Sequence, residues 1–88
     1  MNEITMYQLE SMCYWAQERE SLAKQITEAF KQETLDMKKE DLDELFFEYD
    51  NSCEVINGIE RDVGVKVERS EDVQEASIIY RTYIKMKY

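Results

Sequence analysis

The scarcity of residues that break helices is the feature that most constrains this chain. Its 88 residues include no proline and only two glycines, at positions 58 and 64. A fold with many strands needs glycine and proline at its tight turns, so this composition favours a few long helices. A chain of this length builds one small core, and we expect a single domain over residues 1–88.

A first helix is predicted over about residues 5–31. Thr5 followed by Gln8 matches a capping box, which marks the start of a helix. Beyond it, apolar residues recur at three- and four-residue spacing, as on one buried helix face. The members of this stripe are Leu9, Met12, Ala16, Ala23, Ile26 and Phe30. A second row, Trp15, Leu22 and Ala29, widens the stripe enough to contact more than one neighbouring element.

A second helix is predicted over about residues 39–62, after a short connection at residues 32–38. A connection this short makes the two helices antiparallel neighbours, and Gly64 provides a C-terminal stop. Arg19 and Glu60 interrupt the two apolar stripes. They are expected either at the stripe edges, with their stems packed and their charges in water, or in a second interface, for instance of a dimer, and the sequence does not decide between the two. The stripe of the second helix contains Leu42, Phe46, Tyr49, Cys53, Ile56 and Val63.

Residues 63–88 fit two structures. Apolar residues alternate as in strands around Val65 and again around Ile84, which would give a β-hairpin. Ser70, however, precedes two acidic residues and basic residues follow near the end, as expected for a capped helix aligned with its dipole. A hairpin would also need an unusually long connection. We therefore predict a C-terminal helix over about residues 70–87.

These elements predict a mainly α fold, a small helical bundle built on a long antiparallel helix pair plus the C-terminal helix. The alternative is an α+β fold with a C-terminal β-hairpin.

Negative charge concentrates in the predicted second helix. The chain has 20 acidic and 11 basic residues, a net charge of −9, and no Lys or Arg lies between residues 40 and 54. On a helical wheel of about 100° per residue, the carboxylates of this stretch all lie opposite the apolar stripe. They form a predicted acidic face of Glu40, Asp41, Asp43, Glu44, Glu48, Asp50 and Glu54.

Phe47 makes the acidic face a candidate binding surface. The wheel places it among the carboxylates, on the side away from Phe46. A charged face is often only solvated, and a lone exposed aromatic can be accidental. An aromatic ring inside a polar rim is also how interface hot spots are built. We therefore predict that Phe47 and the acidic face bind a partner protein.

The chain lacks the residues that enzymes most often use for catalysis. The chain has no histidine, which removes the commonest general base and metal ligand and the Ser-His-Asp arrangement. The acidic stretch lacks the order of an EF-hand loop, and no phosphate-binding loop motif occurs. We predict no catalytic residues, no metal site, no cofactor and no enzyme activity. Cys13 and Cys53 are expected as buried free thiols, too far apart along the helix pair for a disulfide.

Location and partner class follow from hydropathy and charge. No apolar run approaches 18 residues and no secretory signal is present, so we expect a cytoplasmic protein without a membrane partner. The negative charge disfavours direct nucleic-acid binding and favours a basic partner.

In size, acidity, helical character and carboxylates laid along one helix, the chain resembles small acidic proteins that bacteriophages encode for host takeover or against host defence, some of which mimic DNA. The resemblance implies an inhibitor in the host cytoplasm that binds the basic nucleic-acid-binding surface of a host protein. Histone-like proteins, nucleases and restriction or CRISPR effectors are candidate partners. The alternative is an adaptor or assembly protein that docks or forms a homodimer through the Tyr-rich, basic segment 80–88.

Overall fold

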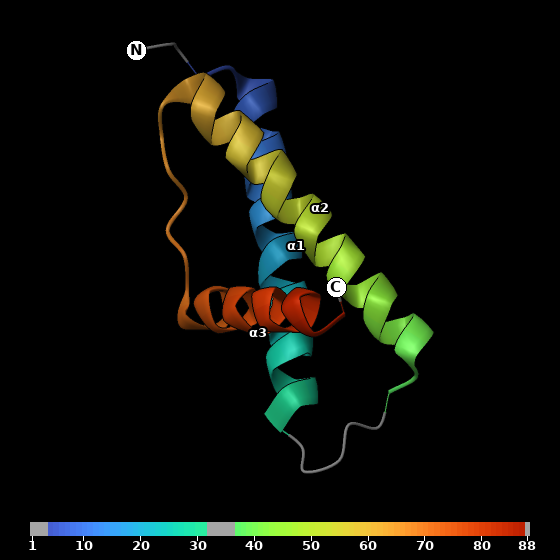
Figure 1. Cartoon of the computed structure of the whole chain (residues 1–88). Coiled ribbons are helices and arrows are strands. Elements are labelled where there is room, and N and C mark those ends of the chain that lie inside the picture. Colours follow the sequence, from blue (N-terminus) through green and yellow to red (C-terminus); the bar gives the residue numbers. More distant parts are fainter. Residues whose placement is uncertain (1–3, 32–36, 88) are drawn as a thin grey trace.

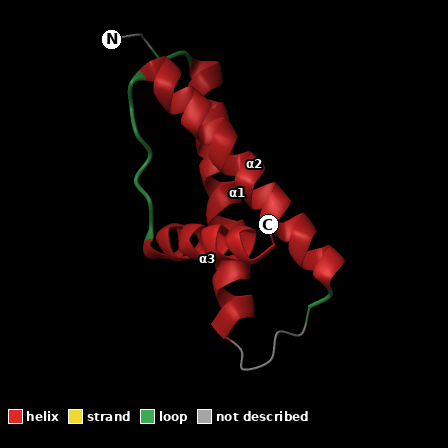
Figure 2. Cartoon of the chain, viewed as in Figure 1, coloured by secondary structure: helices red, strands yellow, loops and turns green. Residues whose placement is uncertain are grey.

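The protein consists of three helices, α1 (Met6–Lys31), α2 (Lys39–Val63) and α3 (Glu71–Lys87). The computed structural model describes residues 4–31 and 37–87, in which no strand occurs (Figure 2). The mainly α prediction is therefore confirmed, and the C-terminal hairpin is not formed. Of the predicted connection at residues 32–38, residues 32–36 lie outside the described residues.

Three helix ends are set by the residues that the sequence predicted as caps or as a stop. Thr5 Oγ1 accepts a hydrogen bond from Gln8 N at 3.1 Å, and Gln8 Oε1 accepts one from Thr5 N at 3.0 Å. This is the capping box before α1. Gly64 ends α2 in the left-handed conformation, with φ of 74°, which glycine adopts without strain. Ser70 Oγ caps α3 by accepting a hydrogen bond from Val73 N at 3.2 Å.

α1 is the central element. It runs antiparallel to α2, and α3 lies across it (Figure 1). Its two apolar rows allow it to pack against both other helices. The molecule measures 47 × 23 × 20 Å, because the pair of α1 and α2 extends well beyond α3 (Figure 1). None of the described helices is long and apolar enough to cross a membrane.

The core lies where the three helices meet, and Phe46 is at its centre. Its ring stacks on Tyr83 with the centroids 4.6 Å apart, and lies 5.6 Å from Tyr80 and 6.0 Å from Phe30. Aromatic pairs of this kind contribute about 0.5–1.5 kcal/mol each beyond their burial. Long aromatic side chains therefore hold α3 to α2. The buried residues of this cluster are Leu22, Ala23, Ile26, Leu42, Leu45, Phe46, Tyr49, Val73 and Ala76.

Tyr49 adds a polar connection between α2 and α3. Its hydroxyl donates a hydrogen bond to the Val73 carbonyl at 2.9 Å and lies 2.8 Å from Ser77 Oγ. Because a phenol has one proton, Ser77 is the donor in the second bond. Burial raises the pKa of Tyr49 to about 12.

Three expectations about single side chains are wrong. Arg19 and Glu60 were expected at stripe edges with their charges in water, but they are 2% and 9% exposed. Glu60 Oε2 accepts a hydrogen bond from Val67 N at 2.7 Å, so the connection between α2 and α3 covers it. Cys13 was expected to be buried but is exposed, while Cys53 is half-buried; both are free thiols.

Candidate functional site

Most of the predicted acidic face lies on the outer side of α2, away from the core. Phe47 is 74% exposed, whereas its neighbour Phe46 is 2% exposed. The two rings diverge because successive helix residues point about 100° apart. An apolar ring thus stands in a row of carboxylates. We call the exposed members of this set the acidic ridge: Glu40, Asp41, Glu44, Phe47, Glu48 and Glu54.

Asp43 and Asp50 do not belong to the acidic ridge. Both are half-buried on the side of α2 that faces α3. The Tyr83 hydroxyl donates a hydrogen bond to Asp43 Oδ1. Burial raises the pKa of Tyr80, and the nearby negative charge of Asp50 raises it further. The structure therefore divides the predicted binding residues into an outer set and a pair that contacts α3.

Phe47 separates two open recesses. The recess between α1 and α2 has a volume of about 220 Å³ and is lined by Tyr14, Trp15, Glu18, Leu22, Phe47, Glu48 and Asn51. The recess between α2 and α3 has a volume of about 420 Å³ and is lined by Asp43, Glu44, Phe46, Phe47, Tyr80, Tyr83 and Ile84. A partner side chain that lies against Phe47 therefore meets aromatic rings on both sides of α2.

The sequence did not indicate that Tyr14 and Trp15 belong to this surface, and it placed Trp15 in the second apolar row of the first helix. They come from α1, form an edge-to-face pair with centroids 5.3 Å apart, and line the same recess as Phe47. Tyr14 is 59% exposed. Its position off the apolar stripe of α1 is the same signal that singled out Phe47, but nothing in the sequence placed it beside α2.

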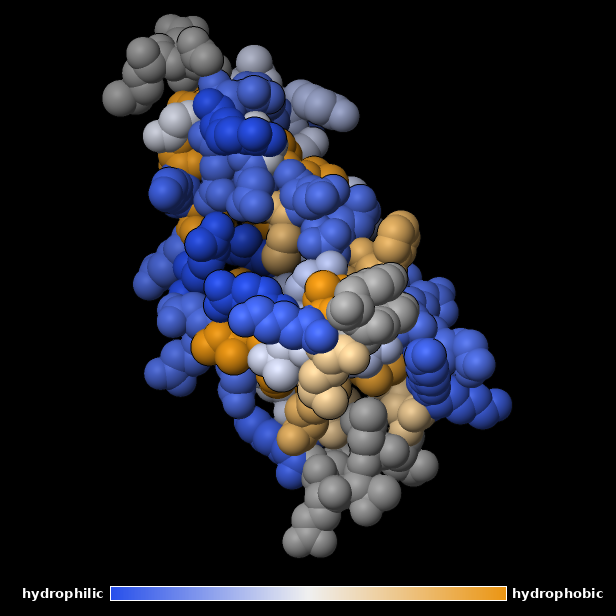
Figure 3. All heavy atoms as spheres, in the orientation of Figure 1, coloured by the Kyte–Doolittle hydropathy of each residue, from blue (hydrophilic) through white to orange (hydrophobic). Residues whose placement is uncertain are grey.

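The acidic ridge offers carboxylate acceptors and one apolar ring. No Lys or Arg occurs from residue 40 to residue 60 of the sequence, so no cation within that stretch neutralises the ridge. Within the described ranges, no three His, Cys, Asp or Glu side chains come together as metal ligands. Figure 3 shows one face of the molecule, which is mostly hydrophilic and carries apolar side chains in separate areas. The ridge is suited to pairing with Lys and Arg side chains.

Comparisons of the chain with protein-family models, with curated proteins and with solved structures found no match.

Proposed function

We propose that the protein is a non-enzymatic inhibitor whose acidic ridge binds the basic nucleic-acid-binding surface of another protein. The observation that carries the proposal is the 74% exposure of Phe47 among carboxylates in a stretch, residues 40–60, that contains no Lys or Arg. The carboxylates pair with the Lys and Arg side chains that otherwise hold phosphates. Phe47 supplies the apolar anchor that such a polar surface lacks.

The length and sign of the charged row support this proposal. A helix rises about 1.5 Å per residue, so the ridge from Glu40 to Glu54 is about 21 Å long. Its five exposed carboxylates are spaced on average by about 5 Å along the helix, wider than the spacing of phosphates along one DNA strand, about 3.4 Å. The negative field also speeds encounter with a basic partner and makes binding sensitive to salt.

The rival function, docking or homodimerisation through residues 80–88, has less support. Tyr80 and Tyr83 pack on Phe46 and are half-buried, so their rings already contribute to the core. Tyr88 lies outside the described residues. We therefore favour the acidic ridge over the C-terminal segment as the binding surface.

Charge reversal on the ridge tests the proposal. The variant Glu44→Lys with Glu48→Lys changes two exposed ridge positions, and Glu10→Lys with Glu28→Lys makes the same charge change at exposed positions of α1. We expect the wild-type protein to retain basic DNA-binding proteins from a bacterial lysate at low salt. Excess duplex DNA should release them. The ridge variant should lose this binding and the α1 variant should keep it.

A second variant separates the apolar anchor from the charge. Phe47→Ala should weaken binding to the retained partner by about 2 kcal/mol, as expected for a hot spot. Its free energy of unfolding should change by less than about 0.5 kcal/mol, because the ring is exposed. Tyr7→Ala is the matched control, since Tyr7 is 79% exposed on α1. Retention that resists DNA, or that survives the ridge variant, would contradict the proposal.

A further inference from the structure

The arginines of the chain gather around two adjoining cavities, although they are far apart in the sequence. The four arginines are Arg19, Arg61, Arg69 and Arg81. Arg19, Arg69 and Arg81 line a cavity of about 460 Å³ between α2 and α3. Arg61 and Arg69 line a neighbouring cavity of about 820 Å³ beside the connection between those helices. In a chain with net charge −9, both linings hold more cationic than anionic side chains. Asp50 lines the smaller cavity, and Glu54 and Glu60 line the larger one beside Arg61, Arg69 and Lys66.

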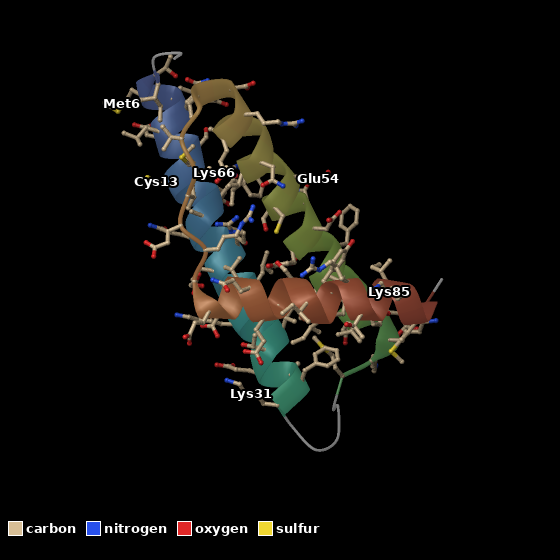
Figure 4. The ribbon with its side chains drawn as sticks, turned by 60° about the vertical axis from the view of Figure 1, so that its left-hand side comes forward. Met6, Cys13, Lys31, Glu54, Lys66 and Lys85 are labelled. Carbon is tan, nitrogen blue, oxygen red and sulfur yellow. The ribbon has the colours of Figure 1, made fainter. Side chains whose placement is uncertain are left out.

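The side of the molecule that carries the connection is shown in Figure 4. Lys66 lies on the connection, Glu54 on α2 and Lys85 on α3, and nitrogen-bearing side chains gather between these elements. The two cavities share Asn57 and Arg69 in their linings, so they lie next to each other. The smaller cavity is lined by none of the residues of the acidic ridge.

Arg19 is the buried arginine of the smaller cavity. It is 2% exposed, while Arg69 and Arg81 are exposed, so it lies at the bottom and they lie at the rim. Within the described part of the chain, its Nε is a buried side-chain donor without a hydrogen-bond partner. Leaving such a donor unpaired destabilises the folded protein, and more so when the group is charged. Arg19 lines the cavity, so an acceptor that reaches Nε from the cavity would satisfy this donor.

The rest of the lining suits an anion. It contributes neutral polar groups from Asn57, Gln74, Ser77 and Tyr80, and one carboxylate, Asp50, against three arginines. The planar guanidinium fork matches the oxygens of phosphate and carboxylate groups. The cavity volume is in the range of small-molecule sites.

We propose that this cavity, the arginine pocket, binds a small molecule that carries a phosphate or carboxylate group, with the oxyanion accepting a hydrogen bond from Arg19 Nε. The depth of Arg19 favours a compact anion, and the net charge of the protein repels long polyanions. The arginine pocket does not depend on the function proposed for the acidic ridge. Each of the two proposals can be refuted without affecting the other.

The Arg19 side chain provides a direct readout. We expect its buried Nε–H group to exchange slowly with water, so that its signal can be followed by ¹⁵N NMR in the full chain. We would titrate inorganic phosphate, adenosine 5′-monophosphate and citrate at constant ionic strength, with adenosine and NaCl as controls. A saturable shift of the Arg19 signal with at least one anion supports the proposal. Phosphate and citrate distinguish the two oxyanion classes, and the monophosphate shows whether an organic group adds affinity. No shift with any of the three anions overturns the proposal.

Variants at the rim keep the proposal testable if changes at Arg19 prevent folding. Arg81→Gln removes one exposed arginine of the pocket, and Lys24→Gln makes the same charge change at an exposed position of α1. Losing a hydrogen bond to a charged group should weaken binding of the effective anion by about tenfold or more. Lys24→Gln should leave the affinity unchanged. An equal loss of anion affinity in both variants would mean that anion binding depends only on the net charge of the protein, and would contradict the proposed pocket.

Removing the acidic group of the pocket should have the opposite effect on anion affinity. Asp50→Asn takes a negative charge out of the lining, so it should tighten anion binding several-fold. Glu28→Gln makes the same charge change at an exposed position elsewhere and should have little effect. Weaker binding by Asp50→Asn would contradict the assignment.

Discussion

At the scale of single residues, Tyr49 shows how one side chain connects two helices. It is 1% exposed, and its hydroxyl lies between the Val73 carbonyl and Ser77 Oγ. Replacing it by Phe keeps the ring but leaves these polar groups without their partner. We expect Tyr49→Phe to lower the free energy of unfolding by about 1–2 kcal/mol, measured by urea denaturation at neutral pH. Tyr7→Phe, at an exposed position, is the control and should not change it.

Tyr49 should also make the stability of the protein fall as the pH becomes alkaline. Burial raises the pKa of Tyr49 to about 12, whereas a free tyrosine has a pKa of about 10. Because the folded state holds the proton more tightly, the stabilisation is complete below the unfolded pKa. It is lost as the pH rises through the folded value. Urea midpoints measured between about pH 9 and about pH 11 should fall less steeply in Tyr49→Phe. An identical slope in the variant would contradict this assignment.

At the scale of elements, Ser70 both starts α3 and fixes it to α1. Its Oγ accepts a hydrogen bond from Val73 N at 3.2 Å and donates one to Glu20 Oε2 at 2.7 Å. Ser70→Ala removes a cap worth about 1 kcal/mol and a hydrogen bond to a charged group, so we expect a total loss of about 2 kcal/mol. The urea midpoint measures this loss.

Two further variants separate the cap from the contact with α1. Ser70→Thr keeps the hydroxyl and should retain most of the stability. Ser70→Asp is an equally good cap in general, but it places a carboxylate against Glu20. It should therefore be clearly less stable than Ser70→Thr. If Ser70→Asp matched the wild-type protein, the contact between Ser70 and Glu20 would contribute nothing.

At the scale of the whole molecule, the net charge of −9 opposes folding through repulsion on α2. Glu44 stands three or four residues from Glu40, Asp41 and Glu48, and each such like-charge pair costs about 0.2–0.5 kcal/mol at low salt. Raising NaCl from low to physiological concentration screens these pairs. We expect the melting temperature to rise by several degrees, about what 1 kcal/mol gives in a domain of this size.

Glu44→Gln removes all three repulsions at once and should reduce this salt dependence. Glu28→Gln makes the same charge change at an exposed position of α1 and should leave most of the dependence in place. A melting temperature that stays flat or falls with added salt in the wild-type protein would show that the crowded charges do not affect its stability.

Much of the fold was predictable because it depends on neighbours within one or two helical turns. The pair Thr5 and Gln8, the cap at Ser70 and the stop at Gly64 act locally, and the three helix ends that these signals predicted lie within one residue of the observed ones. Phe47 was placed outside by the helical period alone. The main part of the candidate binding surface was therefore visible in the sequence.

Only the tertiary structure decided which charged residues are covered. Ser70 bonds to a residue 50 positions away, and no periodicity within one helix reveals where α3 crosses the helix pair. The crossing helix α3 and the connection before it cover Arg19 and Glu60. The same arrangement places Tyr83 against Asp43 and leaves the acidic ridge exposed. It also brings together arginines that the sequence keeps apart. The sequence by itself determined two helices and one acidic face, because those depend on local spacing, and it favoured a third helix over a hairpin; the arginine pocket depends on how the helices pack.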